Sequence, residues 1–117
     1  VFGLGIELDG LVTKQLYGNT IYSDPVQKAN EFSSLLKNEL KCDIVICISH
    51  LGYEYGIKKV SDKILAESSE NIDVVIGGHT HTFLEKPTVA LNRNGKDMLI
   101  NQVGWACINL GKIDLYF

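Results

Sequence analysis

Two short apolar segments that each run into histidine limit the fold of this chain more than any other feature. Residues 44–49 and 72–76 are mostly aliphatic and β-branched, a pattern typical of strands buried on both faces of a parallel sheet. The first segment leads into His50, and the second leads through two glycines into His79 and His81. The chain has only three histidines, so all of them follow these two predicted strands.

Predicted helices separate the strands. A helix is expected over about residues 25–40, because Asp24 is a favourable N-cap and proline at the next position suits the first helical turn. A second helix is predicted over residues 57–69, where apolar side chains recur at helical spacing. Residues 1–8 form the first expected strand, and residues 20–22 a short one.

The character of the sequence changes after Pro87. Strands are predicted over residues 88–91, 98–103 and 108–117, with a hairpin signal at Asn94-Gly95 between the first two. The expected fold is therefore α/β (α+β), a single domain or subdomain over residues 1–117. Its order is strand, helix, strand, helix, strand, then an antiparallel run of about three strands.

The three histidines are expected at one edge of this sheet, because ligand sites of open α/β sheets lie beyond the carboxyl ends of the strands. His79 and His81 are two residues apart and would face the same side of an extended chain. Three imidazoles there would suit a transition metal or zinc. A histidine at a strand end also commonly only packs or forms hydrogen bonds, and the residues alone leave both readings open.

Net charge and the length of apolar runs indicate which kinds of binding partner are not expected. The net charge of −3 gives no electrostatic reason to expect a nucleic acid polymer or an anionic membrane. No apolar run approaches the roughly 18 residues of a membrane span. Residues 1–8 already read as a strand and no methionine precedes them, so we expect the chain to be a segment of a longer protein.

Residues 48–53 (Ile-Ser-His-Leu-Gly-Tyr) and residues 72–84, which contain Gly-Gly-His-Thr-His, resemble the second half of the metallophosphoesterase (calcineurin-like phosphoesterase) domain of the 5′-nucleotidase family. The flanking segments resemble it too, namely residues 2–5, 24–26, 102–104 and 110–113. The resemblance implies that the chain is part of a four-layer α/β sandwich. The upstream half of that domain and any C-terminal nucleotidase domain would be absent.

The resemblance also implies a site and an activity. His50 and His79 would bind one divalent metal and His81 a second, with zinc, manganese, iron, cobalt and nickel all compatible. The metals would activate water to hydrolyse phosphate monoesters, with nucleotides as the expected small-molecule substrates and no protein nucleophile. A 2′,3′-cyclic phosphodiesterase or a sugar phosphatase is the alternative within this chemistry. A periplasmic or extracellular location is implied by family resemblance alone.

Part of the family pattern is missing. The motifs Asp-x-His, Gly-Asp-x-x-Asp and Gly-Asn-His-Asp/Glu do not occur, and Gly18-Asn19 is followed by threonine. We therefore expect the isolated chain to be inactive. The alternative from another class is a non-catalytic α/β subdomain that self-associates through exposed sheet edges.

Other polar residues have more ordinary expected roles. Asp43 and Asp73 precede the two histidine-bearing strands and are expected to form hydrogen bonds at the strand entry. Asp62 is expected in a solvated helix start. Asn101 and Gln102 are candidates to support the site through hydrogen bonds.

Overall fold

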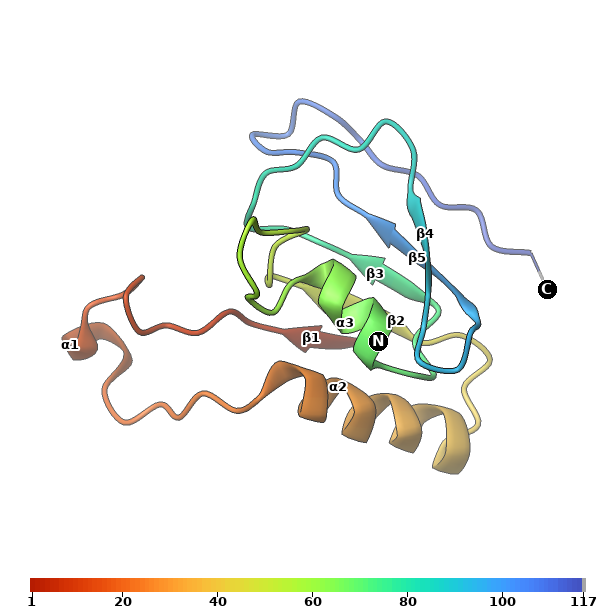
Figure 1. Ribbon diagram of the computed structural model, residues 1–117, viewed down its shortest axis with the longest axis horizontal. Coiled ribbons are helices and arrows are strands. Elements are labelled where there is room, and N and C mark those ends of the chain that lie inside the picture. The colour runs from red at the N-terminus through yellow and green to blue at the C-terminus, as the bar shows by residue number, and fades with distance from the viewer. Residues whose placement is uncertain (117) are drawn as a thin grey trace.

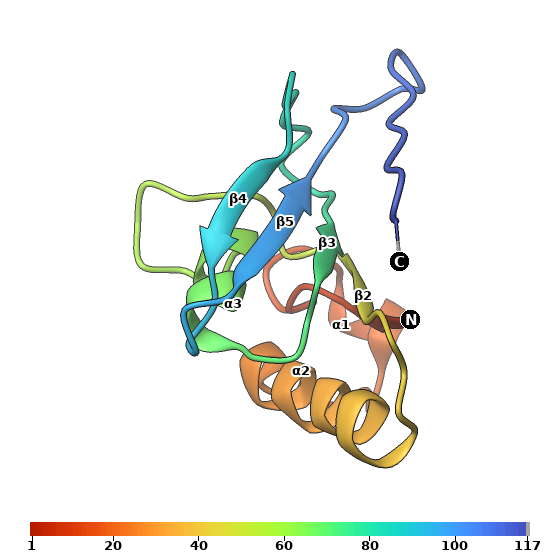
Figure 2. The same ribbon diagram turned by 90° about the vertical axis from the view of Figure 1, so that its right-hand side faces the viewer.

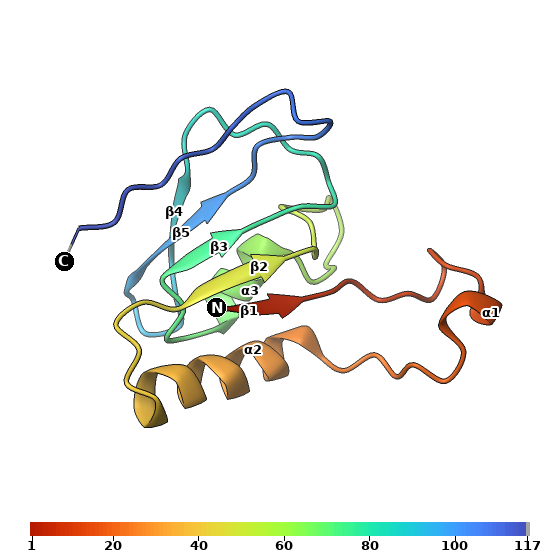
Figure 3. The ribbon, with the colours of Figure 1, turned by 180° about the vertical axis from the view of Figure 1, so that it is seen from behind.

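The computed structural model describes residues 1–116 and contains one mixed sheet. In spatial order the strands are β1 (Phe2–Leu4), β2 (Ile46–Ser49), β3 (Val74–Ile76), β5 (Asp97–Asn101) and β4 (Thr88–Leu91) (Figure 1). The first four are parallel to one another and β4 is antiparallel to β5. Figure 3 shows the parallel strands ending at the same edge. The predicted α/β class and the parallel pairing of the two histidine-bearing strands are confirmed.

Two helices cover one face of the sheet. Helix α2 (Pro25–Ser34) continues as the π-helical turn η1 (Leu35–Glu39), and α3 (Asp62–Ser68) follows β2; α1 (Lys14–Tyr17) is a single turn in an excursion away from the sheet (Figure 1). The Asp24 carboxylate accepts a first-turn amide hydrogen bond at 2.8 Å, which confirms the predicted cap. Within residues 1–116, no helix combines the length and the apolar character that a bilayer crossing requires.

The two faces of the sheet differ in cover (Figure 2). The helix-covered face holds the hydrophobic core, to which Leu4, Ala29, Cys47, Leu51, Leu65, Ala66, Ile72, Val75, Met98 and Ile100 contribute. On the opposite face Ile48 and Ile76 are 55% and 43% exposed. There the C-terminal segment crosses the sheet and leaves an apolar groove of about 420 Å³, lined by Ile46, Val74 and Leu110 among others.

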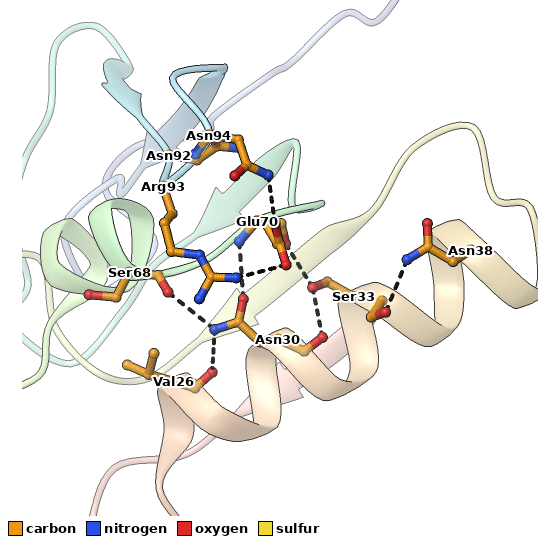
Figure 4. Close-up of polar contacts among 10 residues, drawn as sticks. Val26, Asn30, Ser33, Asn38, Ser68, Glu70, Asn92, Arg93 and Asn94 are labelled. Carbon is orange, nitrogen blue, oxygen red and sulfur yellow. Dashed lines mark hydrogen bonds and ion pairs between the residues drawn. The ribbon is translucent and has the colours of Figure 1, made fainter.

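A polar network fastens the end of the sheet opposite to the histidines (Figure 4). The Glu70 carboxylate accepts hydrogen bonds from Arg93 at 2.8 Å and from Asn94 at 2.6 Å. The Asn30 side chain accepts from Glu70 N and donates to the carbonyl of Ser68, both at 3.1 Å. The network thus joins α2 and the β4–β5 hairpin to the loop between α3 and β3.

Several predicted elements are absent or shorter. Residues 20–22 and 108–116 are irregular, and residue 117 lies outside the described part of the chain. The antiparallel run is only the β4–β5 pair plus a bridge between Phe83 and Val103. The tail cannot continue as a neighbour of β5, because β3 and β4 already occupy both sides of that strand. Helix α3 begins only at Asp62, because Ser61 caps it.

Candidate metal centre

His50 and His79 lie side by side at the carboxyl ends of neighbouring parallel strands. The His50 amide donates to Leu4 O at 2.9 Å, which extends the β1–β2 pairing to the histidine itself. The two imidazole rings meet edge to face with their centroids 5.1 Å apart. His50 is exposed and His79 half-buried, so a solute can reach both rings. The sheet therefore brings together two of the three predicted site residues.

The second loop is a tight turn and not the extended segment expected from the sequence. Thr80 N donates to Gly78 O at 2.9 Å, which closes a three-residue γ-turn around His79. His79 and His81 have φ angles of 72° and 54°, in the left-handed region that side chains other than glycine rarely adopt. Strained backbone of this kind occurs preferentially at functional sites.

Gln102 holds this strained loop in place. Its carbonyl oxygen accepts hydrogen bonds from Thr82 N at 2.5 Å and from the Thr80 hydroxyl at 3.2 Å, and its amide donates to Gly78 O at 3.0 Å. The Thr80 hydroxyl also accepts from Tyr53 N at 2.9 Å, which links the loop to the one that follows His50. Gln102 thus forms hydrogen bonds with the histidine loop, and its support of a metal site stays a prediction.

His81 faces a different neighbour. Its ring stacks on Trp105, with centroids 5.7 Å apart and an interplanar angle of 12°. Within residues 1–116 no group of three or more His, Cys, Asp or Glu side chains lies close enough to hold a metal ion. The convergence of all three histidines therefore stays a prediction, whereas His50 and His79 form a pair.

The surroundings favour the neutral, ligating form of His79. Burial lowers the pKa of His79, and the nearby His50, Lys59 and His81 lower it further. A neutral imidazole has a free nitrogen lone pair that a metal can bind.

The separation of the two histidine rings is compatible with two ligand positions on one divalent metal, and it also lies in the range of ordinary edge-to-face ring contacts. Imidazoles bound to a single ion through bonds of about 2.1 Å at a tetrahedral angle have ring centroids about 5 Å apart. The observed 5.1 Å agrees with that separation. Since such metals take four or more ligands, the rest of the coordination has to come from other groups.

Asp62 differs most from its sequence-based interpretation. It is the first residue of α3, whereas the helix was expected from residue 57, and its side chain is fully buried and not solvated. The Ser49 hydroxyl donates to Asp62 Oδ1 at 2.5 Å. Burial raises the pKa of the Asp62 carboxyl to about 6, and the hydrogen bond from Ser49 opposes that shift. The sequence features that could have indicated this buried carboxyl are the serine directly before His50 and the glycines before His79.

Sequence comparison finds curated proteins that are similar to the chain. No family model matches it. It is 35% identical over 115 residues to an apyrase from Tabanus yao, an alignment that covers 86% of this chain and 20% of the apyrase. It is 28% identical over 117 residues to a trifunctional nucleotide phosphoesterase from Bacillus subtilis, covering all of this chain and 7% of that protein.

A solved structure shares both sequence and fold with the chain. The 5′-nucleotidase precursor from Thermus thermophilus is 30% identical, superposes with a TM-score of 0.59, and is matched over 68% of this chain and 17% of that one. The chain belongs to the 5′-nucleotidase family. As a 5′-nucleotidase-family sequence it spans only about a fifth or less of the length of these relatives.

Proposed function

We propose that this chain supplies His50, His79 and His81 to a binuclear divalent-metal centre that hydrolyses phosphate monoesters, with nucleotides as substrates. The observation that carries the proposal is the pairing of His50 with His79 at 5.1 Å, at the carboxyl ends of adjacent parallel strands. The membership of the chain in the 5′-nucleotidase family supports the choice of reaction.

Each histidine has a distinct proposed task. His50 and His79 would bind one metal, and His81 a second metal after it separates from Trp105. When bound, two divalent metals lower the pKa of a water molecule and neutralise charge that develops on the phosphate. The hydrogen bonds of Gln102 to the loop would keep His79 oriented, and the lowered pKa of His79 would keep it unprotonated at neutral pH.

We further propose that the ligands missing from this chain lie in the upstream half of a metallophosphoesterase domain. Two observations support this: the chain matches only a fraction of its relatives' length, and Ile48 and Ile76 stay about half exposed on a sheet face that the C-terminal segment covers only in part. A second sheet layer from that upstream half would cover the face and complete the four-layer sandwich. A periplasmic or extracellular location is proposed for the parent protein from the family alone.

An activity panel on the full-length protein tests this proposal. We expect metal-dependent phosphate release from nucleoside monophosphates, abolished by a chelator and restored by Mn²⁺. Preference for a 2′,3′-cyclic nucleotide or a sugar phosphate would keep the metal chemistry but reject the nucleotide monoester substrate. Turnover that is unaffected by complete metal removal would reject the proposal.

The isolated chain provides a matched comparison. It should release little phosphate from a chromogenic ester, even with added manganese, because it lacks the remaining ligand motifs. Brisk turnover would show that those motifs are unnecessary. A full-length protein that elutes as a defined oligomer and binds no metal would instead favour the non-catalytic, self-associating module.

A further inference from the structure

Asp62 is an ionisable side chain buried between the two histidine-bearing loops. It is the first residue of α3, its exposed fraction is 0%, and its amide donates to Gly52 O at 2.7 Å. Helix capping does not account for this burial, because Ser61 already caps α3 by accepting a hydrogen bond from Ile64 N. The carboxylate therefore has a role other than starting the helix.

One carboxylate oxygen fastens the loop that carries His50. The Ser49 hydroxyl donates to Asp62 Oδ1 at 2.5 Å and accepts a hydrogen bond from Leu51 N at 3.1 Å. Ser49 and Leu51 are the residues on either side of His50. A single hydroxyl thus ties the backbone around this histidine to Asp62.

The other oxygen lies against the loop that carries His79. Asp62 Oδ2 is buried without a hydrogen-bond partner in residues 1–116, and a methyl group on Gly77 would overlap it. Gly77 is separated from His79 only by Gly78. The carboxyl group of Asp62 is therefore wedged between the two loops whose histidines meet.

An arrangement of this kind costs folding free energy. A buried carboxylate with an unpaired oxygen is poorly solvated, and burial accordingly raises its pKa. An ionisable group held under such conditions beside two exposed or half-buried histidines is a functional-site candidate. A cation bound nearby would offset the cost, because it would interact favourably with the uncompensated negative charge.

We propose that Asp62 is a positioning residue for a divalent cation on His50 and His79: it fixes the spacing of their loops, and its buried negative charge strengthens cation binding. This inference rests on the proposed function, since it requires a cation on that pair. Groups that orient metal-binding histidines typically change metal affinity about 10- to 100-fold when they are lost, and Asp62 would act in this way through the two loops, since it contacts Ser49 and Gly77.

Calorimetric titration of the metal-free, full-length protein with Mn²⁺ tests the role of Asp62. Asp62→Asn, which keeps the shape and removes the charge, should weaken Mn²⁺ binding about 10- to 100-fold. The unfolding midpoint of the metal-free variant at pH 7.5 should be unchanged or raised, and saturating Mn²⁺ should restore kcat. A lowered midpoint with unchanged Mn²⁺ affinity would show that Asp62 is merely structural.

Two further variants serve as a control for charge and as a second test of the role of Asp62. Asp73→Asn removes the same charge at the opposite end of β3, and its Mn²⁺ affinity should stay within about twofold of wild type. Ser49→Ala keeps the Asp62 charge but removes the tether, and should weaken Mn²⁺ binding at least about threefold even where Asp62→Asn does not fold. Unchanged affinity in Ser49→Ala would then overturn the inference.

His79→Ala distinguishes the two levels of the hypothesis. If His79→Ala binds Mn²⁺ as tightly as wild type, the proposed function and the role of Asp62 both fail. If His79→Ala loses binding and a folded Asp62→Asn does not, only the role of Asp62 fails.

Discussion

The imidazole rings of His50 and His79 lie 5.1 Å apart and meet edge to face, because β2 and β3 are parallel neighbours in register from Ile46–Val74 to Ile48–Ile76. Each histidine follows the end of its strand, so the register of the two strands determines the distance between the rings. Beyond the strand ends, the buried carboxyl of Asp62 accepts a hydrogen bond from Ser49 and lies against Gly77.

The stability of the metal-free protein should depend on pH through Asp62. The pKa of its carboxyl is raised from 3.8 to about 6 in the folded protein, so the folded state binds the proton more tightly. The associated stability is fully present below pH 3.8 and is lost as the pH rises through about 6. The loss amounts to about 3 kcal/mol.

Urea unfolding of wild type and Asp62→Asn at pH 4 and pH 7.5, with a chelator present, measures this contribution. Between pH 4 and pH 7.5, the free energy of unfolding of wild type should fall by about 2–3 kcal/mol more than that of Asp62→Asn, because asparagine does not titrate. An equal pH dependence in the two proteins would mean that Asp62 has an ordinary pKa and is not desolvated.

Gly77→Ala should destabilise the fold through a collision with Asp62. The added methyl group would overlap Asp62 Oδ2, and the Gly77 backbone is held by the hydrogen bond from its amide to Asn101 O at 2.8 Å. We expect a loss of about 1–3 kcal/mol of unfolding free energy. Gly5→Ala is the matched control, since nothing lies within 4 Å of its added methyl group.

A double-mutant cycle identifies the cause of the Gly77→Ala loss. Combining Gly77→Ala with Asp62→Ala removes the colliding carboxylate, so the two effects should be non-additive by more than about 0.5 kcal/mol. Simple additivity would place the strain of Gly77→Ala elsewhere in the loop.

In the polar network opposite to the histidines, Asn30 should matter more than Arg93. Asn30→Ala leaves Glu70 N and the carbonyl of Ser68 without their side-chain partner and should cost about 1–3 kcal/mol. Arg93→Ala breaks an ion pair whose arginine side chain is 55% exposed, and should cost less than about 1 kcal/mol. Equal losses in urea unfolding would contradict this order, and neither variant should change the metal content.

Local chemistry made much of the fold predictable. Asp24 followed by proline determined where α2 begins, and the aliphatic runs before the histidines determined β2 and β3. Asp73 performs the expected strand-entry role, since its carboxylate accepts from Val45 N at 2.7 Å, whereas Asp43 contributes only its carbonyl, to Lys37. In each correct case the deciding contact lies close in sequence or follows from strand pairing.

The remaining features depend on contacts between distant segments. Residues 108–116 have a strand-like composition, but they cannot pair with β5, because β3 and β4 already lie on both sides of that strand. The burial of Asp62 results from Ser49 and Gly77, which reach it from two different strand ends. The left-handed φ angles of His79 and His81 depend on the hydrogen bonds that Gln102 makes with their loop. The sequence pattern of a single segment cannot predict such contacts between distant segments.

Elemental analysis of the full-length protein and its His79→Ala variant tests whether His79 is a metal ligand. Wild type should contain two divalent metals per chain, and His79→Ala should contain at least one fewer and lose most phosphatase activity. Asn30→Ala serves as the control and should keep the wild-type metal content. Equal metal content in His79→Ala and wild type would contradict the assignment of His79 as a ligand.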